Sequence, residues 1–479
     1  MNVYETVIGL EVHAQLSTKT KLFCGSSAAF GGEPNARTDP YTLGLPGTLP
    51  VLNALAVRYA IRLGLALGCD IQERSIFARK NYFYPDLPKN YQISQFEAPI
   101  CLGGGVPIRE DGRARTIPLE RIHLEEDAGK SMHLGETSQV DLNRSGVPLV
   151  EIVSKPAMSG PAQAGLYLGS LRQILRYLQI CDGNMEEGSL RCDANISIRP
   201  HRALELGTRV ELKNMNSIRG VVAALEHEYL RQAALLDRGE TVEQETRSWD
   251  PDAKRSVFMR GKEEAHDYRY FPEPDLLPLV LDPQWIRAER DVLPELPFAR
   301  QERLARQLSL PDYDAGVLSS ERELGDYFES VIENKGDAKA ASNWIMSELL
   351  GQLNDRSLSI TEFPVSPAEL AGLLSLIGDG SISGKIAKEV FQEMIDSGRS
   401  AGEIVDAKGL RQISGDDELL GHVTATLEAN PPQCQQYLDG KESVLSFFVG
   451  QIMKATHGQA NPKRTNELLR EALEAKRKA

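Results

Sequence analysis

The chain has 479 residues, of which 41% are hydrophobic and 25% are charged. These proportions are typical of a water-soluble globular protein, and the length suffices for about three domains of ordinary size. No apolar run approaches the roughly 20 residues of a membrane span, and Met1–Glu5 lacks the basic start and apolar core of a signal peptide. The net charge of −14 argues against diffuse attraction to nucleic acid, so any such partner must be held by local patches.

The cysteines are scattered and form no C-x-x-C pair, which argues against a metal cluster or a redox motif. We therefore expect reduced thiols in a cytoplasmic protein without a membrane partner. The six are Cys24, Cys69, Cys101, Cys181, Cys192 and Cys434.

The first predicted strand lies near the N-terminus, where Glu11, His13 and Gln15 alternate with apolar residues. A Gly- and Pro-rich turn at 43–50 leads into a helix predicted over about 52–67. The stretch 80–91 combines aromatic residues with two lysines, which fits either a proline-braced loop on the core or a wall facing a substrate. Gly103–Gly105 is typical of a hairpin tip.

Further strands with acids on one side follow. His123 and Glu125 alternate with apolar residues, 140–144 repeats the theme, and Glu151 sits inside an otherwise apolar run over 147–153. A charge in such a run is costly to bury unless it is paired or bound to a metal. Amphipathic helices over 162–178 and 220–238 are expected to cover the sheet, and 266–279 is predicted as an extended exit segment.

The clearest alternation runs from Ser189 to Arg199 and resumes at 209–213, so the two strands should pair antiparallel. Their polar sides would share one surface. A solvated sheet face is one interpretation, and a concave site is the other. Asp, Asn and Ser are poor strand formers, and the pattern recurs on several strands, so we favour a site. The residues on this surface are Arg191, Asp193, Asn195, Glu211 and Lys213.

From about residue 294 the pattern becomes helical. Ser366, Pro367 and Glu369 form a helix start with a capping box. We predict an α+β fold with three parts: a mainly antiparallel β cradle with covering helices at 1–293, an all-helical domain at 294–406 and a helical tail domain at 407–479. The stretch 454–479 carries seven Lys or Arg against three Glu. It is either a frayed, solvated helix or a tail that binds a nucleic-acid backbone.

Several catalytic motifs are missing. The chain has no phosphate-binding G-x-x-x-x-G-K-[ST] loop and no G-x-S-x-G elbow, and Asn2 excludes an N-terminal cysteine nucleophile. What remains is a group of acids with one histidine, and oxygen ligands of this kind suit Mg²⁺ or Mn²⁺ in phosphate chemistry. The group, which we take as the catalytic candidates, is Glu11, His13, Glu125, Glu126, Glu151, Asp193 and Glu211.

Long motifs then follow one another in a recognisable order. The sequence resembles the family of B subunits of aspartyl/glutamyl-tRNA amidotransferases along its whole length, and Phe448–Ala455 is similar to that family's C-terminal tRNA-binding module. The other motifs are Val7–His13, Arg79–Pro85, Leu124–Lys130, Asp141–Arg144, Met185–Asn195, Glu211–Asn214 and Asp267–Pro272.

The resemblance implies one component of a cytoplasmic heterotrimer with a glutaminase A subunit and a small C subunit. This component would use ATP to phosphorylate the side-chain carboxylate of Glu-tRNA(Gln) or Asp-tRNA(Asn), and ammonia from the A subunit would then displace phosphate. Phosphoryl transfer asks mainly for positioning and for cations, which fits a site without a nucleophile.

The resemblance also implies roles for individual residues. Mg²⁺ would be held by Glu11, His13, Glu125, Asp193 and Glu211. The tail would bind tRNA through Lys454, Lys463 and Arg464. Substrate and ATP would be bound by Lys80, Asn81, Tyr82, Asn143, Arg144, Ser189, Arg191, Asn195, Lys213, Asn214, Tyr268 and Arg269.

One departure and two rivals bear on this interpretation. Some relatives carry a four-cysteine zinc cluster near the N-terminus, but only Cys24 stands there in this chain, so we predict no zinc. An archaeal-type E subunit would need an inserted domain for which the chain has no length. A tRNA-binding adaptor without catalysis has no use for acids gathered on one face.

Overall fold

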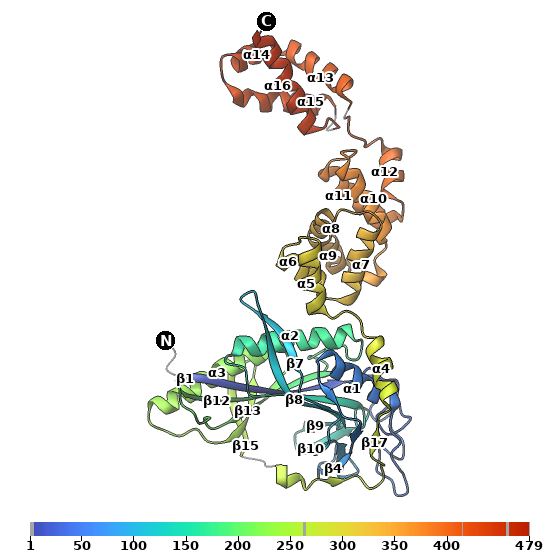
Figure 1. Cartoon of the computed structure of the whole chain (residues 1–479), viewed down its shortest axis with the longest axis vertical. Coiled ribbons are helices and arrows are strands. Elements are labelled where there is room, and N and C mark those ends of the chain that lie inside the picture. Colours follow the sequence, from blue (N-terminus) through green and yellow to red (C-terminus); the bar gives the residue numbers. More distant parts are fainter. Residues whose placement is uncertain (1–3, 262–264, 414, 457–458, 479) are drawn as a thin grey trace. The chain divides into compact units, whose positions relative to one another are not determined.

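The computed structural model describes residues 4–261, 265–413, 415–456 and 459–478, so the predictions on Met1 and Asn2 lie outside the described residues. The chain divides into two compact units, Met1–Phe298 and Ala299–Ala479 (Figure 1). The first unit has one hydrophobic core, whereas the second has two, one within 304–405 and one within 419–473. The three-domain division stays a prediction. Within the described ranges, none of the helices is long and apolar enough to cross a membrane.

The first unit is built on a ten-stranded sheet. Its strands are β1 (Tyr4–Gln15), β2 (Asp70–Ile71), β6 (Cys101–Leu102), β7 (Gly105–Glu110), β8 (Arg113–Glu126), β11 (Pro148–Ser154), β12 (Leu190–Pro200), β13 (Val210–Met215), β14 (Glu245–Asp250) and β15 (Arg255–Gly261). Their order is β15-β14-β13-β12-β1-β11-β8-β6-β2, with β7 also paired to β8. Among the described strand pairs of this sheet, only β13 and β14 run parallel. The mainly antiparallel α+β prediction is confirmed.

Three smaller sheets complete the strands of this unit. β9 (Lys130–Leu134) pairs with β10 (Thr137–Asp141). The second contains β4 (Ala78–Asn81), β5 (Tyr91–Ser94) and β16 (Phe271–Pro272), and the third pairs β3 (Arg74–Ser75) with β17 (Leu279–Val280).

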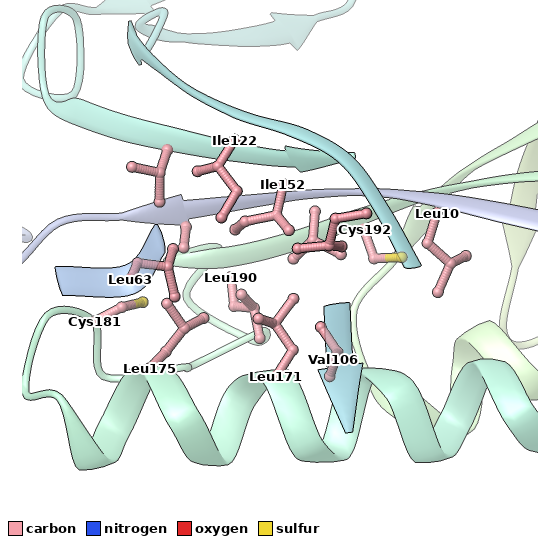
Figure 2. Close-up of a cluster of buried hydrophobic side chains, with 14 of the residues drawn as sticks. Leu10, Leu63, Val106, Ile122, Ile152, Leu171, Leu175, Cys181, Leu190 and Cys192 are labelled. Carbon is pink, nitrogen blue, oxygen red and sulfur yellow. The ribbon is translucent and has the colours of Figure 1, made fainter. Parts of the chain in front are cut away.

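Helices cover the apolar face of the large sheet (Figure 1). They are α1 (Ala54–Ala66), α2 (Pro161–Tyr177) and α3 (Ile218–Asp237). In α2 the apolar residues recur at helical spacing, so that Leu171 and Leu175 point at the strands, where Ile122 and Ile152 lie (Figure 2). Each fully buried side chain of this kind contributes roughly 1.5–3 kcal/mol, which anchors the sheet on its helices.

Two local predictions need correction. Gly103–Gly105 is not a hairpin tip, because β6 and β7 on either side both pair with the 14-residue β8 and not with each other. The tight turn lies instead at Asp111 and Gly112, both with positive φ. The segment 266–279 is extended only in part, because a 3-10 helix at Ala265–Tyr268 overlaps its start.

The second unit is helical. Ser366 and Glu369 form the predicted capping box at the start of α10. In α16, Leu468, Leu469 and Leu473 are buried, so the interpretation of a frayed, solvated helix is wrong. The short α4 (Pro283–Asp291) precedes this unit. The remaining helices are α5 (Pro297–Gln307), α6 (Asp312–Leu318), α7 (Arg322–Glu333), α8 (Ala338–Trp344), α9 (Leu350–Arg356), α10 (Pro367–Gly378), α11 (Gly384–Ser397), α12 (Ala401–Lys408), α13 (Asp416–Ala429), α14 (Pro431–Leu438), α15 (Leu445–Ala455) and α16 (Pro462–Lys478).

Candidate active site

Strand register brings the predicted acids and histidines together on the polar face of the sheet. His13 on β1 lies opposite Glu151 on β11, which lies opposite His123 on β8. In the neighbouring row, Glu11 lies opposite Asp193. Adjacent strands are about 4.8 Å apart and directly opposed side chains share a face, so these residues form one continuous polar surface, as the alternation predicts.

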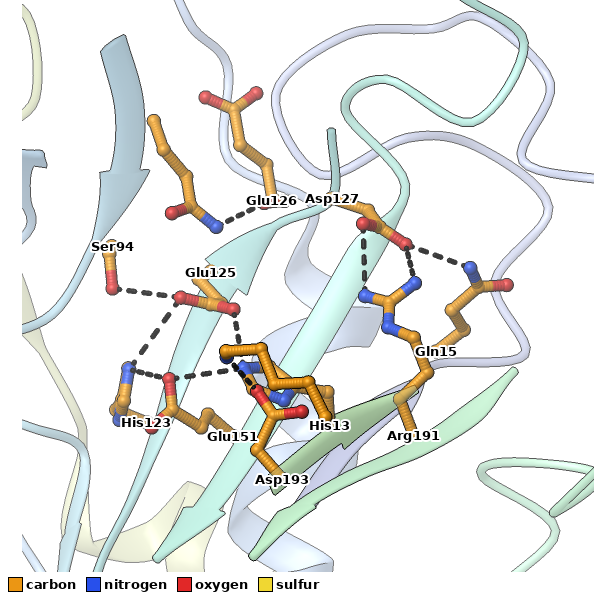
Figure 3. A network of polar contacts seen from close by, with 12 residues as sticks. His13, Gln15, Ser94, His123, Glu125, Glu126, Asp127, Glu151, Arg191 and Asp193 are labelled. Carbon is orange, nitrogen blue, oxygen red and sulfur yellow. Dashed lines mark hydrogen bonds and ion pairs between the residues drawn. The ribbon is translucent and has the colours of Figure 1, made fainter. Parts of the chain in front are cut away.

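Two histidines and two glutamates make the centre of this surface (Figure 3). His13 Nε2 lies 3.5 Å from Glu125 Oε1 and 3.3 Å from Glu151 Oε2. His123 Nε2 is 3.3 Å from Glu151 Oε2, and the Ser94 hydroxyl donates to Glu125 Oε2 at 3.3 Å. Glu151, a charge in an apolar run, is therefore buried with the partners that its burial requires.

Opposite charges outweigh burial in this cluster. Burial lowers the pKa of His13, but the carboxylates of Glu151 and Glu125 overcome this effect and raise the pKa to about 9. The pKa of Glu151 is held well below its usual range, because His123 and His13 outweigh a burial that raises it. Each group favours the charged form of its partner.

The cluster offers a set of ligand atoms for a divalent cation. One atom each from His13, Glu125 and Glu151 lie within 4.8 Å of one another. Carboxylate oxygens suit Mg²⁺ or Mn²⁺ and an imidazole nitrogen suits Mn²⁺ better, so these residues fit such an ion. This set shares His13 and Glu125 with the predicted ligands and adds Glu151.

Lys213 lies between two of the remaining predicted metal ligands, Asp193 and Glu211. Its ammonium is 2.5 Å from Asp193 Oδ2 and 3.1 Å from Glu211 Oε1. Thr246 also donates to Glu211, at 2.7 Å. These carboxylates are thus ion-paired with a side chain in this structure, and Lys213 would compete with a metal for them.

Glu11 connects the two groups of acids. The Asn195 amide donates to Glu11 Oε1 at 3.0 Å. Burial raises the pKa of Glu11, and the nearby Glu151, Asp193 and Glu211 raise it further. A cation bound beside Glu11 would relieve the repulsion between these carboxylates.

Glu126 is not brought to the cluster. It forms an ion pair with Lys89 and accepts a hydrogen bond from the Ile93 N–H at 2.9 Å. Successive strand residues point to opposite faces, so Glu125 and Glu126 cannot both enter the same site. Grouping Glu126 with the other acids was therefore wrong in geometry.

A second polar centre joins Arg191 to Asp127. The guanidinium donates two hydrogen bonds to the Asp127 carboxylate, at 2.9 and 3.0 Å, and Gln15 donates a third at 2.8 Å (Figure 3). Asp127 was not among the predicted site residues, although it lies in the Leu124–Lys130 motif. Its pairing orients Arg191 at the edge of the cavity.

The predicted substrate-binding residues divide into two sets. We call the cavity that contains Glu11, Glu125, Glu151, Asp193 and Glu211 the acidic cavity, and a second cavity beside it contains Asp127 and Arg191. The predicted residues that line one or both of these cavities are Lys80, Tyr82, Arg191, Asn195, Lys213, Asn214 and Tyr268. The others lie outside these two cavities: Asn81, Asn143, Arg144, Ser189 and Arg269.

Two of the residues outside the two cavities, Asn81 and Arg144, donate to backbone carbonyls, and Asn143 and Arg144 line a third cavity. The Asn81 amide donates to the carbonyls of Tyr268 and Arg269, and the Arg144 guanidinium donates to those of Ala128 and Gly129. In the 80–91 stretch, Lys80 and Tyr82 line cavities, and the buried Leu87 lines one of them from the core. Whether this wall faces a substrate stays a prediction.

The sequence reasoning missed cavity residues on β8 and beside it. Arg121 and His123 line the acidic cavity, as do Phe96, Tyr270 and Arg260. Arg121 and His123 precede Glu125 by four and two residues, so the period of two already placed them on its face. The alternation had placed His123 beside Glu125 without making it a site residue, and it had not been extended to Arg121.

The predicted tRNA-binding residues of the tail all belong to the second compact unit. Lys463 on α16 is exposed. The Arg464 guanidinium donates twice to Asp416, at 2.7 Å each, and once to Glu467 at 2.9 Å. Arg464 is therefore engaged within the fold, unlike a free phosphate-binding side chain.

Comparison with known proteins identifies the class and then the family. Residues 6–287 match the model described as "GatB/GatE catalytic domain", and residues 326–473 match a model described as "GatB domain". The cradle with its acidic face is thus a catalytic domain of the GatB/GatE class.

Full-length relatives narrow this class. The chain is 54% identical to the B subunit of the aspartyl/glutamyl-tRNA(Asn/Gln) amidotransferase of Syntrophotalea carbinolica, over 98% of each protein. It is also 54% identical to the protein of that name from Chlorobium phaeobacteroides, over 98% of this chain and 99% of that one, and 53% identical to that of Geobacter sp. strain M21. The chain belongs to the family of these B subunits, which confirms the predicted resemblance and sets the E-subunit interpretation aside.

Proposed function

We propose that this chain phosphorylates and amidates the side-chain carboxylate of Glu-tRNA(Gln) or Asp-tRNA(Asn). The observation that carries the proposal is the cavity on the polar face of the sheet, where Glu125, Glu151 and His13 converge beside Lys80 and Lys213. Anionic groups that can hold a cation and lysines that can meet phosphate are what phosphoryl transfer needs. The names of the relatives support the two tRNA substrates.

The reaction has two steps. A carboxylate oxygen of the aminoacyl side chain attacks the terminal phosphorus of ATP, the bond to the bridging oxygen breaks, and ADP leaves with the bonding electrons. The carboxylate needs no general base, because such groups ionise near pH 4. Ammonia then attacks the acyl carbon, inorganic phosphate leaves, and the nitrogen loses one proton to a carboxylate of the cavity.

The site residues have distinct roles in this proposal. His13, Glu125 and Glu151 would hold a divalent cation, with Glu11 beside them, and the ion would neutralise charge on the phosphate oxygens. Lys80 and Lys213 would contact phosphate. Arg191, held by Asp127, would orient the substrate from the edge of the cavity.

The partners follow from the missing chemistry. The chain contains no glutaminase motif, so ammonia would come from an A subunit, with a small C subunit completing a heterotrimer. The purified single chain should therefore be inactive with glutamine but should form some amide with ammonium salts and ATP. Glutamine-dependent product from the single chain would contradict the proposal. A second test addresses the rival interpretation of a tRNA-binding adaptor without catalysis, because such an adaptor would need neither ATP nor a divalent ion.

We further propose that the C-terminal domain at 407–479 holds tRNA through phosphates, with Lys454 and Lys463 as contacts and Arg464 only after release from Asp416. Removal of this domain should weaken tRNA affinity, and each lost phosphate contact should lower the salt slope by roughly 0.9 or less. Unchanged Michaelis constants for tRNA after this truncation would contradict the proposed role of the domain.

A separate experiment addresses the choice of substrate. Assays of the complex with both misacylated tRNAs would decide which of the two tRNAs is amidated.

A further inference from the structure

Arg121 lines the acidic cavity from β8, on the same face as His123 and Glu125. Its Nε is buried and has no hydrogen-bond partner, and among the described residues its side chain makes no hydrogen bond or ion pair. A buried donor left unsatisfied is unfavourable, so a ligand that satisfies it would be bound favourably.

The absence of a partner within the described part of the chain is unexpected, because the same cavity contains five acids. The strand register explains it. Arg121 lies opposite Val153, and Val153 lies opposite Glu11, so that two strand spacings, or about 10 Å, separate Arg121 from Glu11. Glu151, on the strand next to Arg121, is paired with His13 and His123 instead. A ligand with several anionic oxygens can fill the interval between Arg121 and Glu11.

The surroundings of Arg121 favour a strong interaction with such a ligand. Phe96 and Tyr270 line the same cavity, and their rings stack in parallel with centroids 4.2 Å apart. The guanidinium is close enough to Tyr270 to lower the pKa of its hydroxyl, against burial and the glutamates, which raise it. Aromatic walls exclude water, and a charge pair beside them is screened less than one in bulk solvent.

We propose that Arg121 binds the phosphoryl group that is transferred, first as the terminal phosphate of ATP and then as part of the acyl phosphate. This assignment rests on the proposed function. A guanidinium presents paired N–H donors that match two phosphate oxygens, which an ammonium cannot do. Arg121 stands on β8 in the row of Glu11 and Asp193, separated from Glu11 by Val153, and it would balance phosphate charge at the β8 side of the cavity.

The test uses the complete complex with Arg121→Met and Arg121→Lys. Methionine keeps much of the apolar stem and removes the charge. We expect Arg121→Met to slow acyl-phosphate formation about 10²–10³-fold, as for loss of one transition-state contact, and to raise the KM for ATP. Arg121→Lys should lose about tenfold, because a point charge replaces a two-pronged donor. The matched control is Arg115→Lys, an exposed arginine on the same strand that pairs with Glu110.

Two further readouts distinguish a binding role from a structural one. The side chain of Arg121 forms no hydrogen bond or ion pair with another described residue, so the melting temperature of Arg121→Met should equal or exceed that of the wild type. A clear fall in melting temperature would overturn the proposal. A raised KM for aminoacyl-tRNA with an unchanged KM for ATP would also overturn it, since the bound oxyanion would then be a carboxylate or a tRNA phosphate.

The proposed function and the role of Arg121 can fail separately. If the wild-type complex and Arg115→Lys both form acyl phosphate and Arg121→Met does so at the same rate, only the role of Arg121 is overturned. If the wild-type complex forms no acyl phosphate from ATP and misacylated tRNA, the proposed function fails, and the role of Arg121 fails with it.

Discussion

The large sheet has two faces made by the same strands but under opposite physical demands. On the helix-covered face Val12, Ile152 and Ala194 are fully buried among other apolar side chains. On the other face their sequence neighbours Glu11, Glu151 and Asp193 crowd like charges into a cavity. The first face lowers the free energy of the fold by removing apolar area from water, while the second retains acids whose mutual repulsion opposes folding. Substitutions on the two faces should therefore separate stability from activity.

The largest effect is expected on the polar face. Asp193→Asn or Glu211→Gln removes a carboxylate from the cavity and should slow ATP-dependent amide formation about 10²–10³-fold. Each substitution leaves Lys213 with one carboxylate partner, and this pair is partly exposed, so unfolding should change by less than about 1 kcal/mol. Assays of amide formation and melting curves of the complex measure the change in rate and the change in stability. Glu120→Gln serves as the exposed control. Near-normal phosphorylation would contradict the role of these acids.

The apolar face should give the converse result. Leu171 is completely buried on α2, and Leu171→Ala should lower the free energy of unfolding by about 3 kcal/mol through lost burial and a cavity. The rate per folded molecule should not change. Leu166→Ala on the same helix is the matched control, because Leu166 is 39% exposed and should cost far less. A large loss of rate in folded Leu171→Ala protein would show that the two faces are not independent.

The Asp127–Arg191 pair sharpens the comparison, since it is a polar-face contact that should stabilise the fold. Burial raises the pKa of Asp127, but Arg191 and Arg144 outweigh it and hold the pKa below its usual range. This stability is present above about pH 4, the unfolded value, and is lost as pH falls through the folded one. Asp127→Asn should lower unfolding free energy by about 2 kcal/mol at pH 7, because Arg191 loses its partner.

Denaturant unfolding between pH 3 and pH 7 tests this expectation. The wild type should lose stability on acidification more steeply than Asp127→Asn, because the variant has already lost the titrating carboxylate. Parallel pH profiles of the two proteins would show that Asp127 contributes no linked stability.

The smallest expected effect concerns Thr246, which donates to Glu211 and is itself buried. Thr246→Val keeps the shape and removes one hydrogen bond, which should cost about 1 kcal/mol of unfolding free energy and a few-fold in rate. Chemical denaturation and steady-state assays can resolve both changes. A loss of rate as large as that of Glu211→Gln would mean that Thr246 contacts the substrate instead of supporting Glu211.

Local patterns in the sequence were enough to predict much of the fold. A period of two gave β1, the end of β8, β12 and β13 a polar and an apolar side, helical spacing predicted α2 and α3, and Ser366 with Glu369 predicted a helix start. These features depend on interactions within a few residues, so a single sequence contains them. The same locality explains the error at Gly103–Gly105, where three glycines indicate a turn but not which strands it joins.

Only the tertiary structure decided which polar residues meet. His123 joins Glu151 because β8 pairs with β11 in one register, and Lys213 reaches Asp193 because β13 pairs with β12. Glu126 leaves the site because its neighbour Glu125 takes the polar face. The sequence by itself determined the face of each residue, since that depends on strand period alone. Contact across strands depends on register, which is set by the packing of distant segments and by shifts such as the one between Cys192 and Ala194.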